Sequence, residues 1–184
     1  MGFKIENGVL IKYTEKKGVT RVFIPDGVMS IGIGAFSRCK SLTSLMIPDS
    51  VMNIGDFAFF NCENLISVML PDSMINIGSH IFSWCKSLIS VTIPEGVASI
   101  RWGAFRDCTS LTSVIIPDSV TNIGRGAFRG CTGLTSVVIP DGVTSIENFA
   151  FSGCTNLTSL IIPDSVTNIG KGAFEGCENL NFRD

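Results

Sequence analysis

A fixed interval of 23 residues runs through almost the whole chain. All seven prolines, all seven cysteines and seven of the thirteen phenylalanines recur at this interval without one insertion. Internal periods of about 20–50 residues indicate stacked repeat architectures, so this interval constrains the fold more than any single motif. The three files are Pro25, Pro48, Pro71, Pro94, Pro117, Pro140 and Pro163; Cys39, Cys62, Cys85, Cys108, Cys131, Cys154 and Cys177; and Phe36, Phe59, Phe82, Phe105, Phe128, Phe151 and Phe174.

Each unit predicts two short strands and a turn. In the clearest copy, residues 157–163 are rich in β-branched side chains and end at a proline, which predicts a short strand. Residues 164–165 have turn chemistry, and residues 166–169 predict a second extended segment. Residues 170–177 contain glycines followed by Ala-Phe and are too few for a long helix, so we expect a helical or 3₁₀ turn there.

One such unit cannot bury its own apolar side, but stacked units shield one another. Equivalent residues then lie one strand spacing apart, about 4.8 Å. The chain's hydrophobic content of 45% is enough for a continuous core of inward Leu, Val, Ile, Ala, Phe and Cys. The sequence therefore predicts a repeat solenoid of seven 23-residue coils with a parallel β-sheet.

The first residues predict a cap on this stack. Glu6-Asn7-Gly8-Val9 is a strong two-residue hairpin signal, and we expect residues 1–18 to form a β-hairpin cap. Residues 19–184 would then form the solenoid, within one structural domain. An eighth strand is expected to begin at Leu180, which favours a chain that is part of a longer protein.

The repeat resembles a known family. The pattern L-x-x-[VL]-x-I-P-x-x-V-x-x-I-G-x-x-A-F-x-x-C is similar to BspA-like, or Treponema-type, leucine-rich repeats over residues 19–180. This resemblance implies a curved, right-handed leucine-rich-repeat coil. It also implies bacterial surface or secreted proteins that act in adhesion and host contact. The chain departs from the pattern at Met74, Ile81, Arg101 and Glu147.

Charge and hydropathy exclude several classes of partner. A formal net charge of −2 argues against nucleic acid, because phosphate binding needs a basic surplus. No apolar run of about 20 residues is present, so we expect no membrane insertion. The first residues lack a basic segment followed by an apolar one, so we expect no signal peptide in this chain. A secreted or cell-surface location rests on the family resemblance alone.

No group of residues predicts catalysis, a cofactor or a metal site. The seven cysteines could approach disulfide distance between coils, but they are better explained as buried free thiols. His80 is the only histidine, and because Gly34, Gly103 and other glycines occupy its position, we expect it to be a solvated turn residue. An enzyme needs an acid, a base and a nucleophile together, and the sequence shows no such constellation.

An acidic residue follows every proline of the repeat. These carboxylates could cap their turns by accepting backbone N–H bonds, or could bind a cation weakly. The acidic ladder is Asp26, Asp49, Asp72, Glu95, Asp118, Asp141 and Asp164.

Two outward files are expected on the strands that precede the prolines. One file is almost purely serine and the other, the apolar stripe, is almost purely apolar. A continuous exposed apolar surface usually marks contact with another molecule, although β-propensity in a shielded sheet explains it equally well. The apolar stripe consists of Phe23, Met46, Met69, Ile115, Val138 and Ile161, with Thr92 interrupting it.

The turn positions around Ala-Phe differ most between the seven copies. Repeat proteins recognise partners through variable side chains, and aromatic and Arg residues dominate interface energetics. We therefore interpret these positions as a partner-binding surface, with tolerated drift as the alternative. The predicted patch consists of Phe57, Phe60, Trp84, Trp102, Arg101, Arg106, Arg125 and Arg129.

These observations favour a non-catalytic protein- or glycan-binding module. The alternative is a passive spacer or self-associating scaffold, in which the sheet face forms a homodimer. The sequence does not name the ligand.

Overall fold

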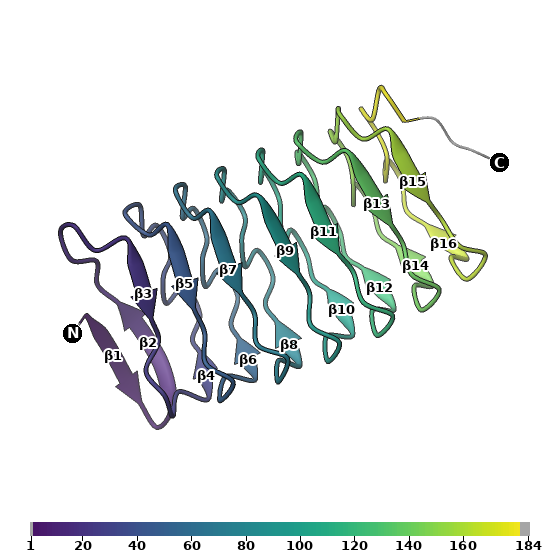
Figure 1. Cartoon of the computed structure of the whole chain (residues 1–184). Helices are drawn as coiled ribbons and strands as arrows, with labels where there is room; N and C mark the ends of the chain where they lie inside the picture. The colour runs from purple at the N-terminus through teal and green to yellow at the C-terminus, as the bar shows by residue number, and fades with distance from the viewer. Residues whose placement is uncertain (1, 181–184) are drawn as a thin grey trace.

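The computed structural model describes residues 2–180 and shows an elongated stack of coils with the two termini at opposite ends (Figure 1). Each coil contributes one three-residue and one two-residue strand, and the described residues contain no helix. The predicted solenoid of stacked 23-residue coils with parallel strands is confirmed. The eighth strand expected beyond Leu180 lies outside the described residues.

An antiparallel hairpin precedes the first coil. Strands β1 (Phe3–Glu6) and β2 (Val9–Tyr13) pair with each other. The link between them has φ of 49° at Asn7 and 75° at Gly8, which are the left-handed values that a two-residue hairpin turn requires.

The hairpin packs on the first coil. Strand β2 pairs in parallel with β4 (Ser30–Ile31), as each later two-residue strand does with its neighbour in the same sheet. Leu10 of the hairpin is fully buried. The Tyr13 ring stacks on the Phe36 ring with centroids 5.1 Å apart, so the hairpin shields the first ring of the buried file.

The repeat strands lie in two files on the solenoid (Figure 1). Partners are one repeat apart in every parallel pair between repeat strands, such as Val22 with Leu45. The three-residue strands are β3 (Arg21–Phe23), β5 (Ser44–Met46), β7 (Ser67–Met69), β9 (Ser90–Thr92), β11 (Ser113–Ile115), β13 (Ser136–Val138) and β15 (Ser159–Ile161). The other two-residue strands are β6 (Asn53–Ile54), β8 (Asn76–Ile77), β10 (Ser99–Ile100), β12 (Asn122–Ile123), β14 (Ser145–Ile146) and β16 (Asn168–Ile169).

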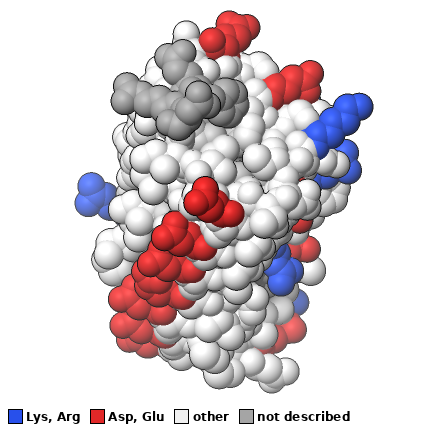
Figure 2. Space-filling model, turned by 90° about the vertical axis from the view of Figure 1, so that its right-hand side faces the viewer, with Lys and Arg blue, Asp and Glu red and all other residues white. Residues whose placement is uncertain are grey.

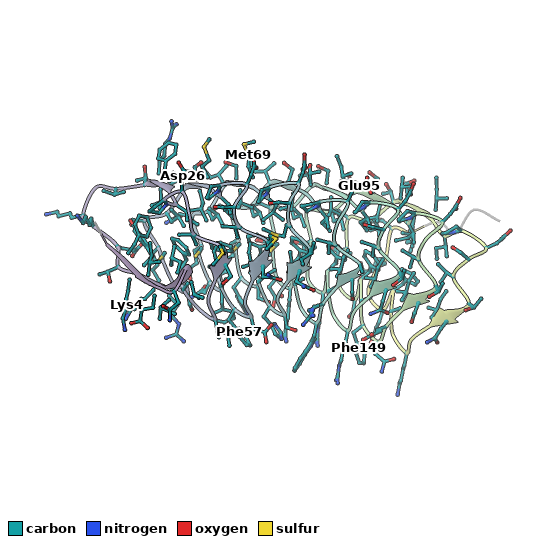
Figure 3. The ribbon with its side chains drawn as sticks, turned by 90° about the horizontal axis from the view of Figure 1, so that it is seen from below. Lys4, Asp26, Phe57, Met69, Glu95 and Phe149 are labelled. Atoms are coloured by element: carbon teal, nitrogen blue, oxygen red, sulfur yellow. The ribbon has the colours of Figure 1, made fainter. Side chains whose placement is uncertain are left out.

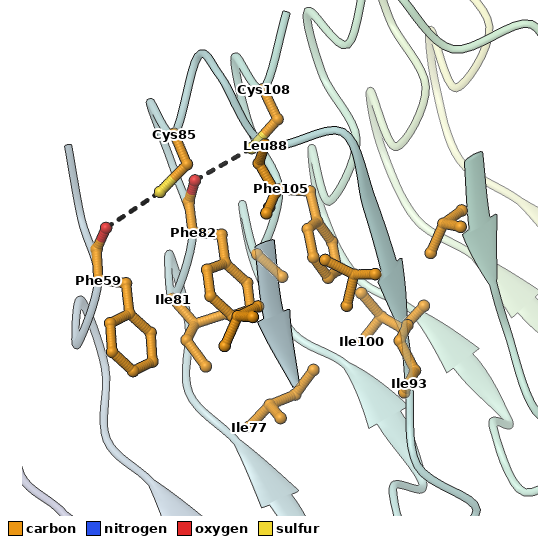
Figure 4. Close-up of a cluster of buried hydrophobic side chains, with 14 of the residues drawn as sticks. Phe59, Ile77, Ile81, Phe82, Cys85, Leu88, Ile93, Ile100, Phe105 and Cys108 are labelled. Atoms are coloured by element: carbon orange, nitrogen blue, oxygen red, sulfur yellow. Dashed lines mark hydrogen bonds between the residues drawn. The ribbon is translucent and has the colours of Figure 1, made fainter. Parts of the chain in front are cut away.

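A file of phenylalanine rings forms the centre of the core. Successive rings from Phe36 to Phe174 have centroids 5.1–5.7 Å apart, and those from Phe36 to Phe151 are fully buried. Leucine, isoleucine, valine and alanine of each coil pack around them (Figure 4). Burying each large apolar side chain stabilises the stack by about 1.5–3 kcal/mol.

The cysteines are free, as the sequence predicted, and all but Cys177 are buried. Their thiols bond to the backbone: Cys85 Sγ donates to the carbonyl oxygen of Phe59 at 3.2 Å, and Cys108 Sγ to that of Phe82 at 3.0 Å (Figure 4). Burial raises the pKa of the Cys108 thiol well above its ordinary value. The Cys108 thiol therefore stays protonated and unreactive inside the stack.

The expected helical or 3₁₀ turn is wrong. A helical turn needs consecutive N–H groups to bond back within the segment. Here the N–H groups of Arg106 and Cys108 bond back to Gly103 and Phe105, but those of Phe105 and Asp107 donate to the next coil. Left-handed φ values of 59° at Gly103 and 58° at Asp107 reset the direction of the chain. The segment is a series of turns that also hydrogen-bonds to its neighbour.

Two further observations concern the described residues alone. No helix among residues 2–180 is long and apolar enough to cross a membrane. Within the same range, no three His, Cys, Asp or Glu side chains are grouped so that they could hold a metal ion.

Candidate functional site

The two surfaces singled out in the sequence lie on opposite long sides of the solenoid. Figure 3 shows Asp26, Met69 and Glu95 along one side, and Phe57 and Phe149 along the other. We call the first side, formed by the outward residues of the three-residue strands, the sheet face. We call the second, formed by the turns around Ala-Phe, the turn face. A ligand bound to one face does not contact the other.

The apolar stripe on the sheet face is exposed. In the three-residue strands the middle residue is buried, and the first and third residues point outward. The six apolar members of the stripe are 49–68% exposed. This exposure excludes the interpretation of a shielded sheet, while the role of the stripe in contact stays a prediction.

The acidic ladder runs beside the apolar stripe. Figure 2 shows a continuous file of acidic side chains along the molecule. Each proline-acid turn is closed by a backbone bond such as Val51 N–H to Pro48 C=O at 3.0 Å. The hydrogen bonds and ion pairs found among residues 2–180 involve no ladder carboxylate. The expectation that these carboxylates cap their turns is therefore wrong for the described residues.

Two positions of the turn face are left-handed in every coil, and the first of them is the position of Phe57. The φ values at this first position lie between 53° and 63°. Glycine occupies this position in four coils, whereas Phe57, His80 and Phe149 occupy it in the other three. A side chain in this conformation costs about 1–2 kcal/mol, so these aromatic residues are held in a strained backbone.

Four rings form a continuous cluster on the turn face. The Phe57 ring is 5.8 Å from that of Phe60 in an edge arrangement, and 5.0 Å from the ring of His80, on which it stacks. The His80 ring meets the Trp102 ring at 4.7 Å. Phe57 is 40% exposed and Trp102 is 54% exposed. The structure thus joins three predicted patch residues through a histidine that the predicted patch did not include.

The expectation of a solvated His80 is wrong. The residue is only 9% exposed, because Phe57 and Trp102 cover its ring. Ser83 Oγ donates its proton to the Gly103 carbonyl at 2.7 Å and lies 3.0 Å from His80 Nδ1. Since that hydroxyl proton is already used, His80 donates from Nδ1. Burial, assisted by Arg106 and opposed by Asp56, lowers the pKa of His80.

The other predicted patch residues lie outside this ring cluster. Trp84 has a left-handed φ of 66° and is 39% exposed, with Lys86 Nζ 5.5 Å from the centre of its ring. Arg106 Nε pairs with the neighbouring Asp107 at 3.2 Å. These side chains extend the turn-face surface, but no ring contact joins Trp84 to the cluster within the described part of the chain.

The remaining arginines are exposed and bring in one further aromatic residue. Arg101, Arg125 and Arg129 are exposed, and the Arg129 guanidinium lies 5.9 Å from the centre of the Phe149 ring. Phe149 occupies the same left-handed position as Phe57. His80 and Phe149 vary between copies at this same repeat position, so the variation that marked the patch covers them as well.

The geometry and the repeat pattern agree with a comparison of sequences. The chain matches the model of the BspA type leucine rich repeat region at residues 12–135 and 99–182. It belongs to the BspA-type leucine-rich-repeat family. No curated protein matches this BspA-type chain in sequence.

Solved structures show the same BspA-type fold. A leucine-rich repeat protein of T. pallidum (TpLRR) is 35% identical, with a TM-score of 0.90 over 97% of this chain and 87% of that chain. A leucine-rich repeat protein of Eubacterium ventriosum is 28% identical, with a TM-score of 0.87 over 96% of this chain and 47% of that chain. A leucine rich cell surface protein of Faecalibacterium prausnitzii is 29% identical, with a TM-score of 0.52 over 97% of this chain and 73% of that chain.

Proposed function

We propose that this BspA-type solenoid is a non-catalytic binding module whose turn face recognises a protein or glycan ligand. The observation that supports it most is the set of aromatic residues held at a position where other coils have glycine. Strain of this kind persists where the surroundings enforce it, and it gathers at binding sites. The recognition surface consists of Phe57, Phe60, His80, Trp84, Arg101, Trp102, Arg106, Arg125, Arg129 and Phe149.

The side chains of this surface suit recognition. Trp102 and Phe57 present exposed ring area on the turn face, and Arg101 and Arg125 are exposed on the same face. Rings supply a large apolar contact at low cost in side-chain entropy, and arginine binds carboxylate or phosphate oxygens with two parallel bonds. The chemistry thus favours a ligand that combines a flat apolar face with acidic groups.

We place the module in a bacterial surface or secreted protein that acts in adhesion or host contact. Support comes from the Faecalibacterium prausnitzii structure, which is described as a cell surface protein. A location outside the cell would expose the turn face to host and bacterial glycans and proteins.

Two tryptophan variants test the proposal. The ligand is first identified on a glycan array and by capture of host-cell and bacterial surface proteins on the immobilised chain. Trp84→Ala and Trp102→Ala are then compared with Phe23→Ala, an exposed aromatic residue on the opposite face. Loss of an interface aromatic residue is expected to weaken binding about thirtyfold, and Phe23→Ala to leave it unchanged. Unchanged affinity in both tryptophan variants would refute recognition by the turn face.

A second candidate function is that of a self-associating scaffold. The exposed apolar stripe favours it, because such a surface is often covered in an assembly. The molar mass of the purified chain, measured by light scattering, distinguishes the two functions. A stable dimer that Met69→Thr dissociates supports the scaffold, and a monomer argues against it.

A further inference from the structure

The sheet face holds two grooves in which apolar and acidic side chains face the same space. The first has a volume of about 680 Å³ and is lined by Phe23, Met46 and Met69 together with Asp26 and Asp49. The prolines of the same turns, with Ile24, Ile47 and Leu70, complete its lining. The second lies further along the chain, so the two grooves follow the same side of the stack.

The second groove repeats the chemistry of the first. Its volume is about 560 Å³, and its lining includes Ile115, Val138 and Ile161 together with Asp118 and Asp141. Thr92 stands between the two apolar groups in the sequence of the stripe. The same pairing of an apolar wall with carboxylates therefore occurs twice, three coils at a time.

Charge restricts what binds these grooves. The carboxylates recur at the coil spacing of about 4.8 Å, and no cationic side chain neutralises them within the described residues. Carboxylates aligned in this way repel one another and raise the local concentration of cations. An uncharged occupant that covered the apolar wall would also remove the carboxylates from water. Because it would offer them no positive charge in return, its binding would be unfavourable.

A second copy of the chain does not meet this requirement through its own sheet face. Of the outward positions in the described three-residue strands, Arg21 alone is basic. The rest are serine, apolar residues or Thr92. Two sheet faces packed together would bury carboxylates with almost no cations opposite them. A metal ion would neutralise carboxylates but leave the apolar wall in water.

We infer that the sheet face binds a basic amphipathic peptide segment, with its apolar side chains in the grooves and its Lys or Arg side chains on the acidic ladder. A helix suits the spacing, because its turns repeat every 5.4 Å and the coils about every 4.8 Å. Two turns then match the three coils of one groove, with apolar residues at i, i+3 or i+4 and i+7. This surface is separate from the turn face and is independent of its function.

Two synthetic peptides test the inference on the intact chain. The first, of about 18 residues, has leucines along one face of a helix and lysines elsewhere. The second has the same composition in an order that spreads the leucines around the helix. Fluorescence anisotropy of the labelled peptides should give micromolar binding for the first and at least tenfold weaker binding for the second. Equal binding of the two peptides would show charge attraction alone and overturn the inference.

Variants of the chain locate the peptide. Met69→Thr with Ile115→Thr places the residue found at Thr92 in each groove, and should weaken binding about tenfold. Asp49→Asn with Asp118→Asn should weaken it about threefold and reduce its salt dependence. The matched control, Glu63→Gln with Glu178→Gln, removes two carboxylates that line neither groove and should leave binding unchanged.

Three results separate this inference from the other proposals. Trp84→Ala and Trp102→Ala should bind the peptide as the parent does, so failure of turn-face recognition leaves this test intact. A loss in the Glu63→Gln, Glu178→Gln control equal to that in the groove variants overturns the inference. A parent dimer that resists the peptide and dissociates on Met69→Thr with Ile115→Thr also overturns it, because a second copy then covers the face.

Discussion

The first and second halves of the solenoid share one core but differ in surface. The phenylalanine rings stack at 5.1–5.7 Å throughout. On the surface, one outward position is apolar in the first three coils and threonine in the last three. A second is isoleucine in two coils of the first half and threonine in the others, including Thr20 and Thr43. The exposed apolar residues are Met29, Met52, Ile75, Ile66 and Ile89, and their later counterparts are Thr121, Thr144, Thr167, Thr112, Thr135 and Thr158.

The threonines make an additional contact between coils. Thr144 Oγ1 donates to the Thr121 carbonyl at 3.3 Å, and the Thr144 N–H already donates to the same oxygen at 2.9 Å. Met52 has no hydroxyl, yet its N–H donates to the Met29 carbonyl at 3.0 Å. Since the backbone bonds do not need the side chain, the surface is free to vary. The comparison teaches that the buried files set the fold while the outward files are available for binding.

The largest effect tests whether the two halves share a core. Phe82→Ala in the first half and Phe128→Ala in the second should each lower the free energy of unfolding by about 3–5 kcal/mol, because both rings are fully buried between two others. Denaturant titration measures both, with exposed Phe23→Ala as the control. A loss in one half alone would contradict a shared core.

A smaller effect on stability is expected from glycine-to-alanine exchanges at the repeat position that Phe57 and His80 occupy in the first half. Gly126→Ala should cost about 1 kcal/mol, because φ is 57° and the added Cβ has room. Gly103→Ala should cost about 2–3 kcal/mol, because the added Cβ also meets the His80 ring. Thermal and denaturant unfolding compare the two. Equal losses of free energy of unfolding in the two variants would mean that the His80 ring moves aside from the added Cβ at no cost.

A pH dependence of stability near neutral pH should arise from His80, which lies in the first half. The pKa of His80 is lowered in the folded state, so the unfolded chain takes up the proton first as the pH falls. The free energy of unfolding should therefore decrease as the pH falls below about 6.5. Unfolding measured at several pH values in the parent and in His80→Gly checks this. The same slope in both would exclude His80 as the source.

The smallest effect concerns the variable surface. Ile89→Thr gives an early coil the residue of a later one, and the new hydroxyl can donate to the Ile66 carbonyl, which already accepts the residue 89 N–H at 3.2 Å. Its stability should stay within about 0.5 kcal/mol of the parent. Thr112→Ile is the reverse exchange and should be equally mild. A loss above about 1 kcal/mol in either would show that these positions are not free to vary.

The fold was predictable because its determinants recur in every coil. The interval between Phe36, Phe59 and Phe82 predicted the buried ring file, and the Asn7-Gly8 pair predicted the hairpin. The candidate site was predictable only in part. Variation between copies singled out Phe57 and Trp102, but not the contact that joins them.

What the sequence alone determined is the periodic part of this protein: strands, turns and buried files that follow from local pattern and from the need of each coil to cover the next. Only the tertiary structure decided that His80 is buried, because its burial depends on rings one coil before and one coil after it. It also decided that the helical turn does not form, because every second N–H bonds to the neighbouring coil. Contacts between side chains on separate coils leave no trace in the pattern of any single repeat.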